Sequence, residues 1–328
     1  MLFSNWQQHT KEQTTKNLYA VKFKIKPKVK EIDPLEVIEE INKMFSNEIK
    51  PMKLQPSKQN KTLDKDKMME CPAIELHLGK LAWAGDTGQD YDQHIAKARF
   101  KEIIQTIIDK QSIAKCGTLC ITIGADFFNS DTVQNTTTKG TIQQNDVRWK
   151  KMFLVGVQLY VEAFALLKEH FNKIDVQLCQ GNHDNMSAFY LYIALKNALA
   201  SDKTINFSDN IKETQCYQFG QCVIFTNHGD VNLNRLIKSI TAEFYQEWGQ
   251  SLYRELHLGH LHKEVMVDDN SGMITRRIGS PSGTDEWHYH ERFIGAIQKH
   301  QLFIWEANTG LKEIIMIPFE RENEKVRR

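Results

Sequence analysis

Short apolar runs alternate with longer helical patterns along the middle of the chain. A strand-length run is bounded by polar or turn residues, whereas a helix repeats apolar residues every three to four positions. The predicted segments are a strand at 73–78, a helix at 91–110, a strand at 118–123, a helix at 147–171, a strand at 174–178 and a helix at 187–199. Strands that alternate with helices are typical of βαβ units around a mostly parallel sheet. We therefore predict an α/β fold.

The pattern changes after Gln221, where strand-like runs follow one another with few helices between them. The predicted strands lie at 222–226, 256–258, 264–267, 275–278, 302–305 and 314–317. Sheets bury their apolar faces against another layer. We expect a second sheet packed on the first.

The front of the chain has a weaker pattern. Residues 20–26 alternate apolar and charged side chains like an edge strand, and 34–45 have helical spacing after the capping candidate Asp33. Residues 50–70 are polar and predict a linker. We expect a small N-terminal β-α element and linker at 1–70, a main domain at 71–320 and a charged C-terminal tail at 321–328.

Composition excludes several kinds of partner. The 328 residues carry 42 basic and 41 acidic side chains, so no overall field draws the molecule to nucleic acid or to an anionic membrane. The six cysteines form no CxxC pair, and the sequence contains neither a signal peptide nor an apolar run of about 18 residues. We expect a soluble cytoplasmic protein without a membrane partner.

Five clusters of metal-ligand residue types lie near predicted strand ends. They are Glu75-Leu-His77, Gly124-Ala-Asp126, Gly181-Asn182-His183-Asp184, Asn227-His228-Gly-Asp230 and Gly259-His260-Leu-His262. Imidazole, carboxylate and amide groups together suit Mn²⁺, Fe²⁺ or Zn²⁺. Side chains two apart on a strand point the same way, so we expect each ExH or HxH pair to face one site.

The order of these motifs resembles that of the calcineurin-like metallophosphoesterase superfamily. GNHD at 181–184 and GHLH at 259–262 are the specific signals, and the likeness covers about 71–320. The sequence around these motifs resembles that of a phage and bacterial subgroup, and His-Leu-Gly at 77–79 resembles DNA-repair exonucleases. The resemblance implies a four-layer sandwich, in which two mixed sheets are flanked by helices.

The resemblance also implies a dimetal site. Mn is the first choice of metal, with Fe, Zn or Ni as alternatives, and a hydroxide that bridges the ions would attack phosphorus while His183 protonates the leaving oxygen. Asp126 would be shared by both ions. The implied ligands are Glu75, His77, Asp126 and His262 for one ion, and Asp126, Asn182, His228 and His260 for the other.

Two positions depart from the family pattern. Glu75 stands where the family has Asp, so its carboxylate reaches one methylene farther. Asn129 stands where many members place Asp or His beside the catalytic His, so a neutral partner would orient His183. Asp184 either compensates for this change or caps the following helix.

Four residues are candidates for substrate binding. Lys80 or Arg148 could neutralise a phosphate oxygen, with a solvated surface charge as the alternative. Trp287 and His288 could stack on a base or sugar, with packing as the alternative. His257 is expected to be structural.

The function expected first is that of a metal-dependent phosphodiesterase, a hydrolase of ester bonds, acting as a nuclease on DNA or RNA. This rests on the subgroup likeness and on the lack of the GDxVDRG motif that marks protein phosphatases. The alternatives are a phosphomonoesterase or small-nucleotide hydrolase and a non-catalytic binding scaffold. A homodimer or a partner ATPase is left open.

Overall fold

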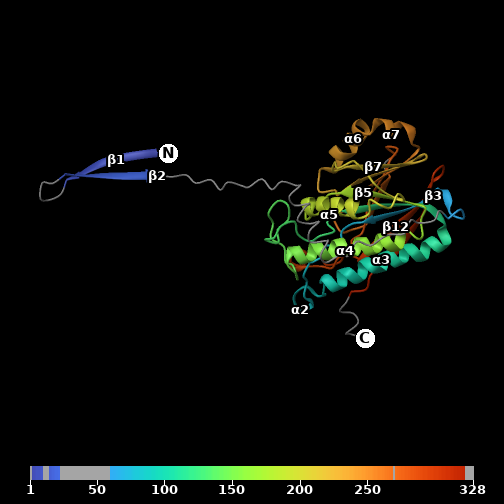
Figure 1. Ribbon diagram of the computed structural model, residues 1–328, viewed down its shortest axis with the longest axis horizontal. Coiled ribbons are helices and arrows are strands. Elements are labelled where there is room, and N and C mark those ends of the chain that lie inside the picture. Colours follow the sequence, from blue (N-terminus) through green and yellow to red (C-terminus); the bar gives the residue numbers. More distant parts are fainter. Residues whose placement is uncertain (1, 10–14, 23–59, 269, 322–328) are drawn as a thin grey trace. The chain divides into compact units, whose positions relative to one another are not determined.

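The computed structural model describes residues 2–9, 15–22, 60–268 and 270–321. Contacts divide the chain into two units, Met1–Glu40 and Ile41–Arg328. In the first unit, β1 (Leu2–His9) and β2 (Thr15–Lys22) pair antiparallel, as Figure 1 shows. The strand predicted at 20–26 overlaps the end of β2. Three other predictions lie outside the described residues. They are the rest of that strand, the helix predicted at 34–45 and positions 322–328 of the predicted tail.

The first sheet of the second unit contains the parallel strands that the sequence predicts. Its strands are β3 (Asp64–Ala73), β4 (Cys116–Gly124), β5 (Lys173–Cys179), β6 (Ile205–Phe207), β12 (Lys299–Glu306) and β13 (Gly310–Pro318). They lie in the order β13-β12-β3-β4-β5-β6. Strands β3 to β6 run parallel, whereas β12 is antiparallel to β3 and β13.

The second sheet is also mixed. Its strands are β7 (Gln215–Phe219), β8 (Cys222–Asn227), β9 (Tyr253–Leu258), β10 (Val265–Asp268) and β11 (Ile274–Arg277). They lie in the order β10-β11-β9-β8-β7, with β8, β9 and β11 parallel.

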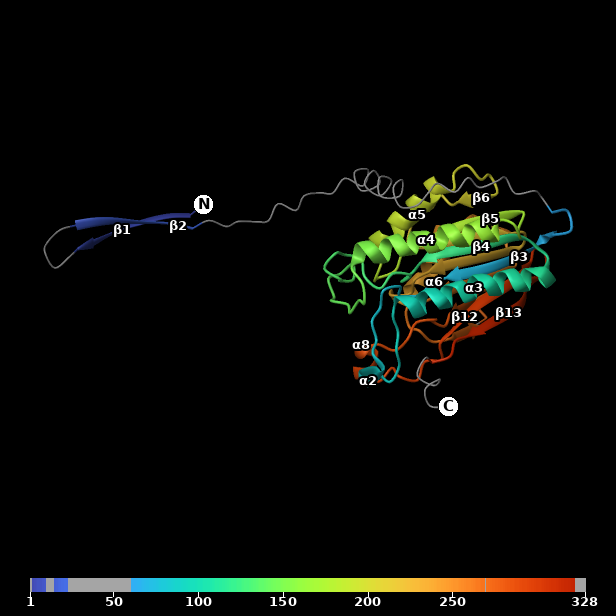
Figure 2. The same cartoon turned by 60° about the horizontal axis from the view of Figure 1, so that its bottom comes forward.

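Helices cover the outer faces of both sheets (Figures 1 and 2). Helices α3 (Gln93–Ala114), α4 (Trp149–Leu167) and α5 (Asn185–Ala198) lie over the first sheet. Helices α6 (Leu233–Glu243) and α7 (Tyr245–Gln250) lie over the second. The short helices α2 (Ala84–Thr87) and α8 (Glu286–His290) lie beside each other. The predicted α/β fold, with two mixed sheets flanked by helices, is confirmed.

Alternation along β8 explains how the sheets pack. Cys222 and Ile224 face the core between the sheets, where they meet Phe303 and Trp305 of the first sheet. Their neighbour Phe225 faces the opposite way, against α6. Because successive side chains on a strand point to opposite faces, a strand buried on both sides contains apolar residues throughout.

Several predicted boundaries are wrong. The strand predicted at 73–78 ends at Ala73 and begins at Asp64, so 64–70, expected to be linker, are part of β3. The charged start of this strand hides it, because the pairing with β4 and β12 that stabilises it is not visible locally. Strands β12 and β13 join the first sheet, and three helices among the described residues follow Gln221.

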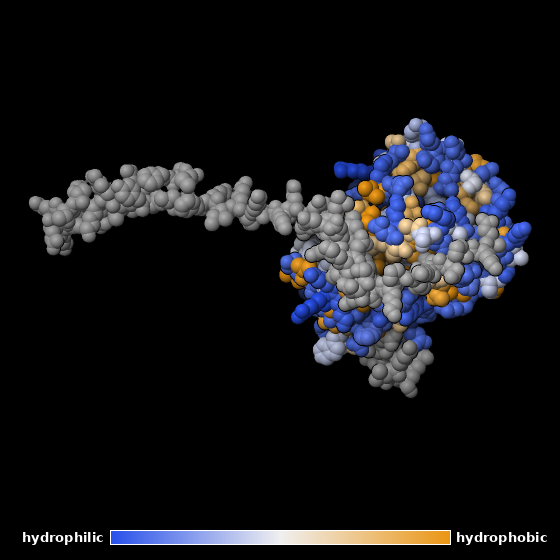
Figure 3. Space-filling model, in the orientation of Figure 1, coloured by the Kyte–Doolittle hydropathy of each residue, from blue (hydrophilic) through white to orange (hydrophobic). Residues whose placement is uncertain are grey.

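No helix in the described ranges is both long and apolar enough to span a bilayer. On the face drawn in Figure 3, hydrophobic residues reach the surface in separate patches among hydrophilic ones.

A buried ionic network connects the sheets. His257 Nδ1 is 2.8 Å from Glu70 Oε1, and its Nε2 is 2.9 Å from Glu255 Oε2. Arg276 Nε donates to Glu255 at 2.9 Å, and Trp305 Nε1 donates to Glu70 at 2.8 Å. His257 is therefore structural, as its position in the sequence suggests.

We expect His257→Ala to lower the free energy of unfolding by about 3–5 kcal/mol, because two buried carboxylates lose the cation between them. Denaturant unfolding measures this loss. The exposed variant His170→Ala is the control and should change stability by less than about 0.5 kcal/mol. An equal effect of the two variants would contradict the role of the network.

The same histidine makes stability depend on pH. Burial alone would lower the pKa of His257, but Glu70 and Glu255 outweigh it and raise the pKa to about 9. A raised pKa stabilises the fold fully below the unfolded value of about 6.5, and this contribution is lost as pH rises through about 9. We expect unfolding free energy to fall across this range in the wild type, with a smaller slope in His257→Ala.

Candidate metal centre

The predicted ligand clusters lie at one edge of the two sheets. Glu75 and His77 follow β3, Asp126 follows β4, and the GNHD residues follow β5, which are parallel neighbours in the first sheet. His228 follows β8, and the GHLH residues follow β9, which are parallel neighbours in the second. Since parallel strands end at the same edge, distant segments meet there.

The backbone holds these residues in an unusual conformation. Glu75, His77, Asp126, His260 and His262 have φ angles of 59°, 49°, 65°, 68° and 50°. Residues with a Cβ seldom adopt this left-handed region, and such strain often accumulates at functional sites. Glu75 with His77, and His260 with His262, therefore do not lie on strands as expected. Glu75 and His77 still face one point, whereas His260 and His262 face two different points.

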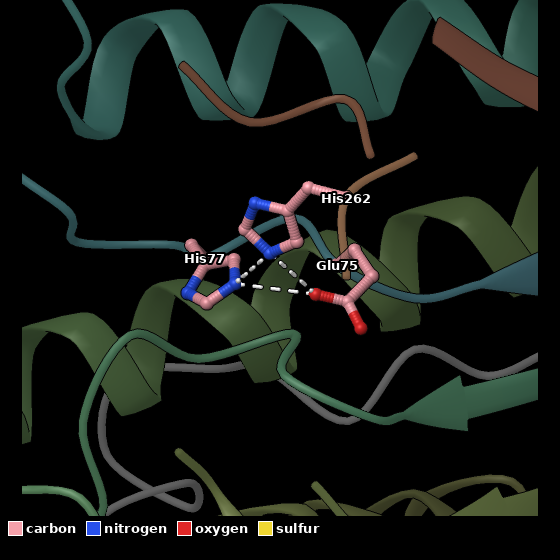
Figure 4. Close-up of side chains that lie close together, drawn as sticks. All are labelled: Glu75, His77 and His262. Carbon is pink, nitrogen blue, oxygen red and sulfur yellow. Dashed lines mark hydrogen bonds and ion pairs between the residues drawn. The ribbon is translucent and has the colours of Figure 1, made fainter. Parts of the chain in front are cut away.

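A first donor group is formed by Glu75, His77 and His262 (Figure 4). Glu75 Oε2 is 2.9 Å from His262 Nε2 and 3.3 Å from His77 Nε2. The two imidazole nitrogens are 3.1 Å apart. Three ligand atoms from two sheets therefore converge on one point.

A second donor group is formed by Asp126, His228 and His260. His228 Nε2 is 3.2 Å from Asp126 Oδ2 and 2.7 Å from Asn182 Oδ1, so the predicted amide ligand is also present. The rings of His228 and His260 are 4.9 Å apart. All seven residues predicted as ligands thus lie in or against the two groups.

Glu75 contacts both groups. Its second oxygen, Oε1, accepts a hydrogen bond from the backbone N–H of His260 and is 3.5 Å from His228 Nδ1. Asp126 belongs to the second group, and its Oδ1 accepts the backbone N–H of His183 at 2.7 Å. The longer side chain at position 75 therefore reaches across the site, while sharing of Asp126 between two ions stays a prediction.

Histidines keep the carboxyl groups ionised. Burial would raise the pKa of Glu75, but the neighbouring His262 and His77 rings hold it well below its usual value. The pKa of Asp126 is lowered to about 2, because His228 outweighs its burial. Burial lowers the pKa of His77 to about 3, so this ring is neutral near pH 7. Anionic oxygens and a neutral imidazole are the forms that bind metals.

The hydrogen-bonding pattern fits cations at both groups. His77 Nδ1 donates to Asn129 Oδ1 at 3.2 Å, which leaves Nε2 with a lone pair toward the first group. Nε2 of His262 approaches that lone pair at 3.1 Å. In the second group, His228 Nε2 lies 3.2 Å from Asp126 Oδ2, while its Nδ1 lies 3.5 Å from Glu75 Oε1. Ring nitrogens placed this close to one another and to carboxylate oxygens are a feature of ligands arranged for an ion.

The residues predicted for catalysis are present but have different partners. His183 Nδ1 donates to the backbone carbonyl of Asn129 at 3.0 Å, whereas the Asn129 side chain bonds His77. Asp184 neither contacts the His183 ring nor caps α5 with its side chain. Its buried carboxyl accepts the backbone N–H groups of Asp126, Phe128 and Gly181 at 3.0, 3.2 and 3.1 Å. Asp184 thus holds the Asp126 loop against the GNHD loop.

Asp131, which was not expected from the sequence to be functional, supports the same loop. Its carboxylate accepts the backbone N–H groups of Met186 and Ser187 at 3.1 and 2.7 Å, in the first turn of α5. Thr138 from the polar loop at 135–141 donates to it at 2.8 Å. Asp131 and Ser187 are 56 positions apart, so no local signal in the sequence points to this role, although carboxylates do stabilise helix N-termini.

Two glycines allow the loops to approach. A Cβ at Gly181 would collide with Asp126, and a Cβ at Gly259 would collide with Glu75. The glycine of GNHD and the glycine of GHLH are therefore required by the proximity of the ligands.

The donor groups open into a cavity of about 1460 Å³ that is lined by His183, Trp287 and His288, among other residues. The prediction that Lys80 binds phosphate is wrong, because Lys80 is 1% exposed and its Nζ is 3.1 Å from Asp285 Oδ2. Arg148 is exposed at the start of α4 and does not line the cavity. Lys139, which the sequence analysis did not select, does line it.

No family model matches the chain, and no curated protein is a significant match. Solved structures similar to it include a dimetal phosphatase from Danio rerio, at 9% identity and a TM-score of 0.38, over 78% of this chain and 100% of that chain. Vps29 from Chaetomium thermophilum has 9% identity and a TM-score of 0.31, over 78% and 98%. A double mutant of Vps29 from Entamoeba histolytica has 14% identity and a TM-score of 0.30, over 66% and 89%. At these values the likeness alone establishes neither family nor activity.

We expect Asp184→Ala to destabilise the chain by about 2–4 kcal/mol, because buried N–H donors lose their acceptor. Hydrogen exchange should become faster at 126–128, since the loop is no longer held. Asp209→Ala, at an exposed ion pair with Lys196, is the matched control and should have little effect. Unchanged exchange in Asp184→Ala would contradict the assigned role.

Proposed function

We propose that this chain is a metal-dependent phosphoesterase that hydrolyses phosphodiesters, with DNA or RNA ends as its substrates. The observation that carries the proposal is the pair of buried carboxylate and histidine groups that open into one cavity beside His183. Divalent ions held there would polarise the phosphate and activate water for attack. The resemblance to calcineurin-like metallophosphoesterases supports the same reaction class.

The residues of the chain have two kinds of role at the site, holding the ions and keeping the ligands in position. Glu75, His77 and His262 would hold one ion, and Asp126, His228 and His260 the other, with Asn182 beside them. Asn129 orients His77 through Nδ1, and Asp184 keeps the Asp126 loop in place. Each of these contacts preorganises the site before substrate binds.

His183 is the proposed proton donor to the leaving oxygen. Its Nδ1–H is fixed by the Asn129 carbonyl, so Nε2 is the atom left to transfer a proton. Its ring lies edge-on to His77 at 4.8 Å, which places it next to the first donor group. The neutral carbonyl orients the ring without adding the charge of a carboxylate partner.

We expect purified protein to bind two Mn²⁺ ions per chain, as measured by elemental analysis after removal of free metal. His262→Ala and His228→Ala should each bind one ion, because each removes a ligand from a different group. The exposed variant His94→Ala should retain both. Wild-type protein with no bound metal would exclude the proposal.

We expect a chelator to abolish hydrolysis of methyl p-nitrophenyl phosphate and Mn²⁺ to restore it. His183→Ala should lower kcat by about 10²–10⁴-fold, because it removes the proton donor but no ligand. Bound metal and unfolding temperature should stay close to those of the wild type. A fully active His183→Ala would show that another group donates the proton.

A substrate panel tests the finer assignment. With Mn²⁺ present, single-stranded DNA, duplex DNA, RNA, a cyclic nucleotide and a phosphomonoester are compared by kcat/KM. Preference for a polymer supports the nuclease assignment, whereas preference for the monoester would replace it with phosphomonoesterase activity.

A further inference from the structure

An aromatic wall lines the cavity next to the donor groups. We use this name for Trp287, Tyr289 and Phe293, which are 60%, 39% and 58% exposed and all line the cavity. Exposed aromatic side chains that gather in a concave site commonly mark binding surfaces. These three rings have no role in the two donor groups or in the contacts of Asn129 described above.

The wall is continuous with the first donor group. The His288 ring stacks on His262 with centroids 5.0 Å apart and planes at 15°. Trp287 lies edge-on to His288 at 5.0 Å, and its ring is 5.8 Å from that of Phe293. One imidazole thus separates a predicted metal ligand from the wall, so a ligand with its phosphate at the donor groups can reach Trp287.

A buried lysine and a half-buried aspartate hold the wall in position. Asp285 accepts the backbone N–H of His288 at 2.9 Å and lies 2.7 Å from its Nδ1. Lys80 is paired with the other oxygen of Asp285 and donates to the carbonyl of Gly283 at 3.2 Å. Lysine is rarely buried unless it is paired, and this pair fixes the short helix α8. The exposed rings are therefore carried by a braced segment.

The chemistry of the wall favours a nucleobase. Aromatic faces stack on bases of any sequence, and base edges need hydrogen-bonding groups nearby. Glu286 and Arg292 are exposed and also line the cavity, so they can provide such groups. An alkyl chain would use the apolar surface but not these polar groups.

We propose that the aromatic wall binds the base of a nucleotide phosphodiester whose phosphate lies at the donor groups. The proposal rests on the proposed function and adds the surface that binds the base of its substrate. Trp287 is the main specificity residue, and Lys80 and Asp285 are positioning residues that act through α8.

Two substrates with the same leaving group test this idea. Thymidine 5′-(p-nitrophenyl) phosphate and methyl p-nitrophenyl phosphate differ in the nucleoside alone, so the ratio of their kcat/KM values measures its contribution. We expect a ratio of about tenfold or more in the wild type, and a ratio about tenfold smaller in Trp287→Ala. Trp287→Phe should keep most of the preference because it retains a ring. Trp83→Ala, which is 67% exposed and outside the cavity lining, should keep the wild-type ratio.

A wild-type ratio near one, or a ratio unaffected by Trp287→Ala, would overturn the proposal. So would an equal gain for hexyl p-nitrophenyl phosphate, which would indicate an alkyl site. If neither ester is cleaved with Mn²⁺, the proposed function fails, and the wall is then tested by binding alone.

Calorimetry with thymidine 5′-monophosphate and with a single-stranded oligothymidylate distinguishes a free nucleotide from a strand end. Weaker binding of the preferred ligand to Trp287→Ala supports the wall, and equal binding to both proteins overturns it.

Discussion

The buried carboxylate of Glu75 is the interaction on which the site depends. Glu75 follows a strand of the first sheet, accepts a hydrogen bond from the backbone N–H of His260 and lies 2.9 Å from the His262 ring. Both histidines follow a strand of the second sheet. A buried carboxylate is costly unless partners surround it, so the two sheet edges must stay close for the charge to be stabilised. His257 makes a similar connection deeper between the sheets, with a carboxylate from each side. The same kind of interaction therefore stabilises the sandwich and assembles the donor groups.

The loops at this edge have a strained backbone, and this conformation places the ligand side chains at the site. Left-handed backbone at the ligand residues costs free energy, and it persists because surrounding hydrogen bonds hold it. Asp184 supplies several of these bonds, and Asp131 does the same for the start of α5. Glycines at 181 and 259 let the loops approach where any side chain would collide. These hydrogen bonds therefore compensate for the strained backbone and keep the ligand residues in position.

The cavity combines two kinds of surface. Its floor offers buried anionic and imidazole donors, whereas the α8 segment offers exposed rings held by Lys80 and Asp285. A phosphate ester has the same division, with a charged centre and an organic substituent. Lys80, near the site, is not free for phosphate because its charge is paired with Asp285 at the start of α8.

Local pattern in the sequence was sufficient for much of the architecture. Helical spacing predicted α3, α4 and α5, apolar runs predicted β4 and β5, and the five clusters near strand ends predicted that distant segments meet at the sheet edge. These features follow from periodicity and from the rule that parallel strands end together.

Tertiary structure decided the rest. The charged start of β3, the return of β12 to the first sheet, and the partners of Lys80, Asn129 and Asp184 all depend on contacts between residues distant in the chain. Burial and pairing at such contacts decide which of many chemically similar residues becomes the partner. The local sequence pattern does not show which partner that is.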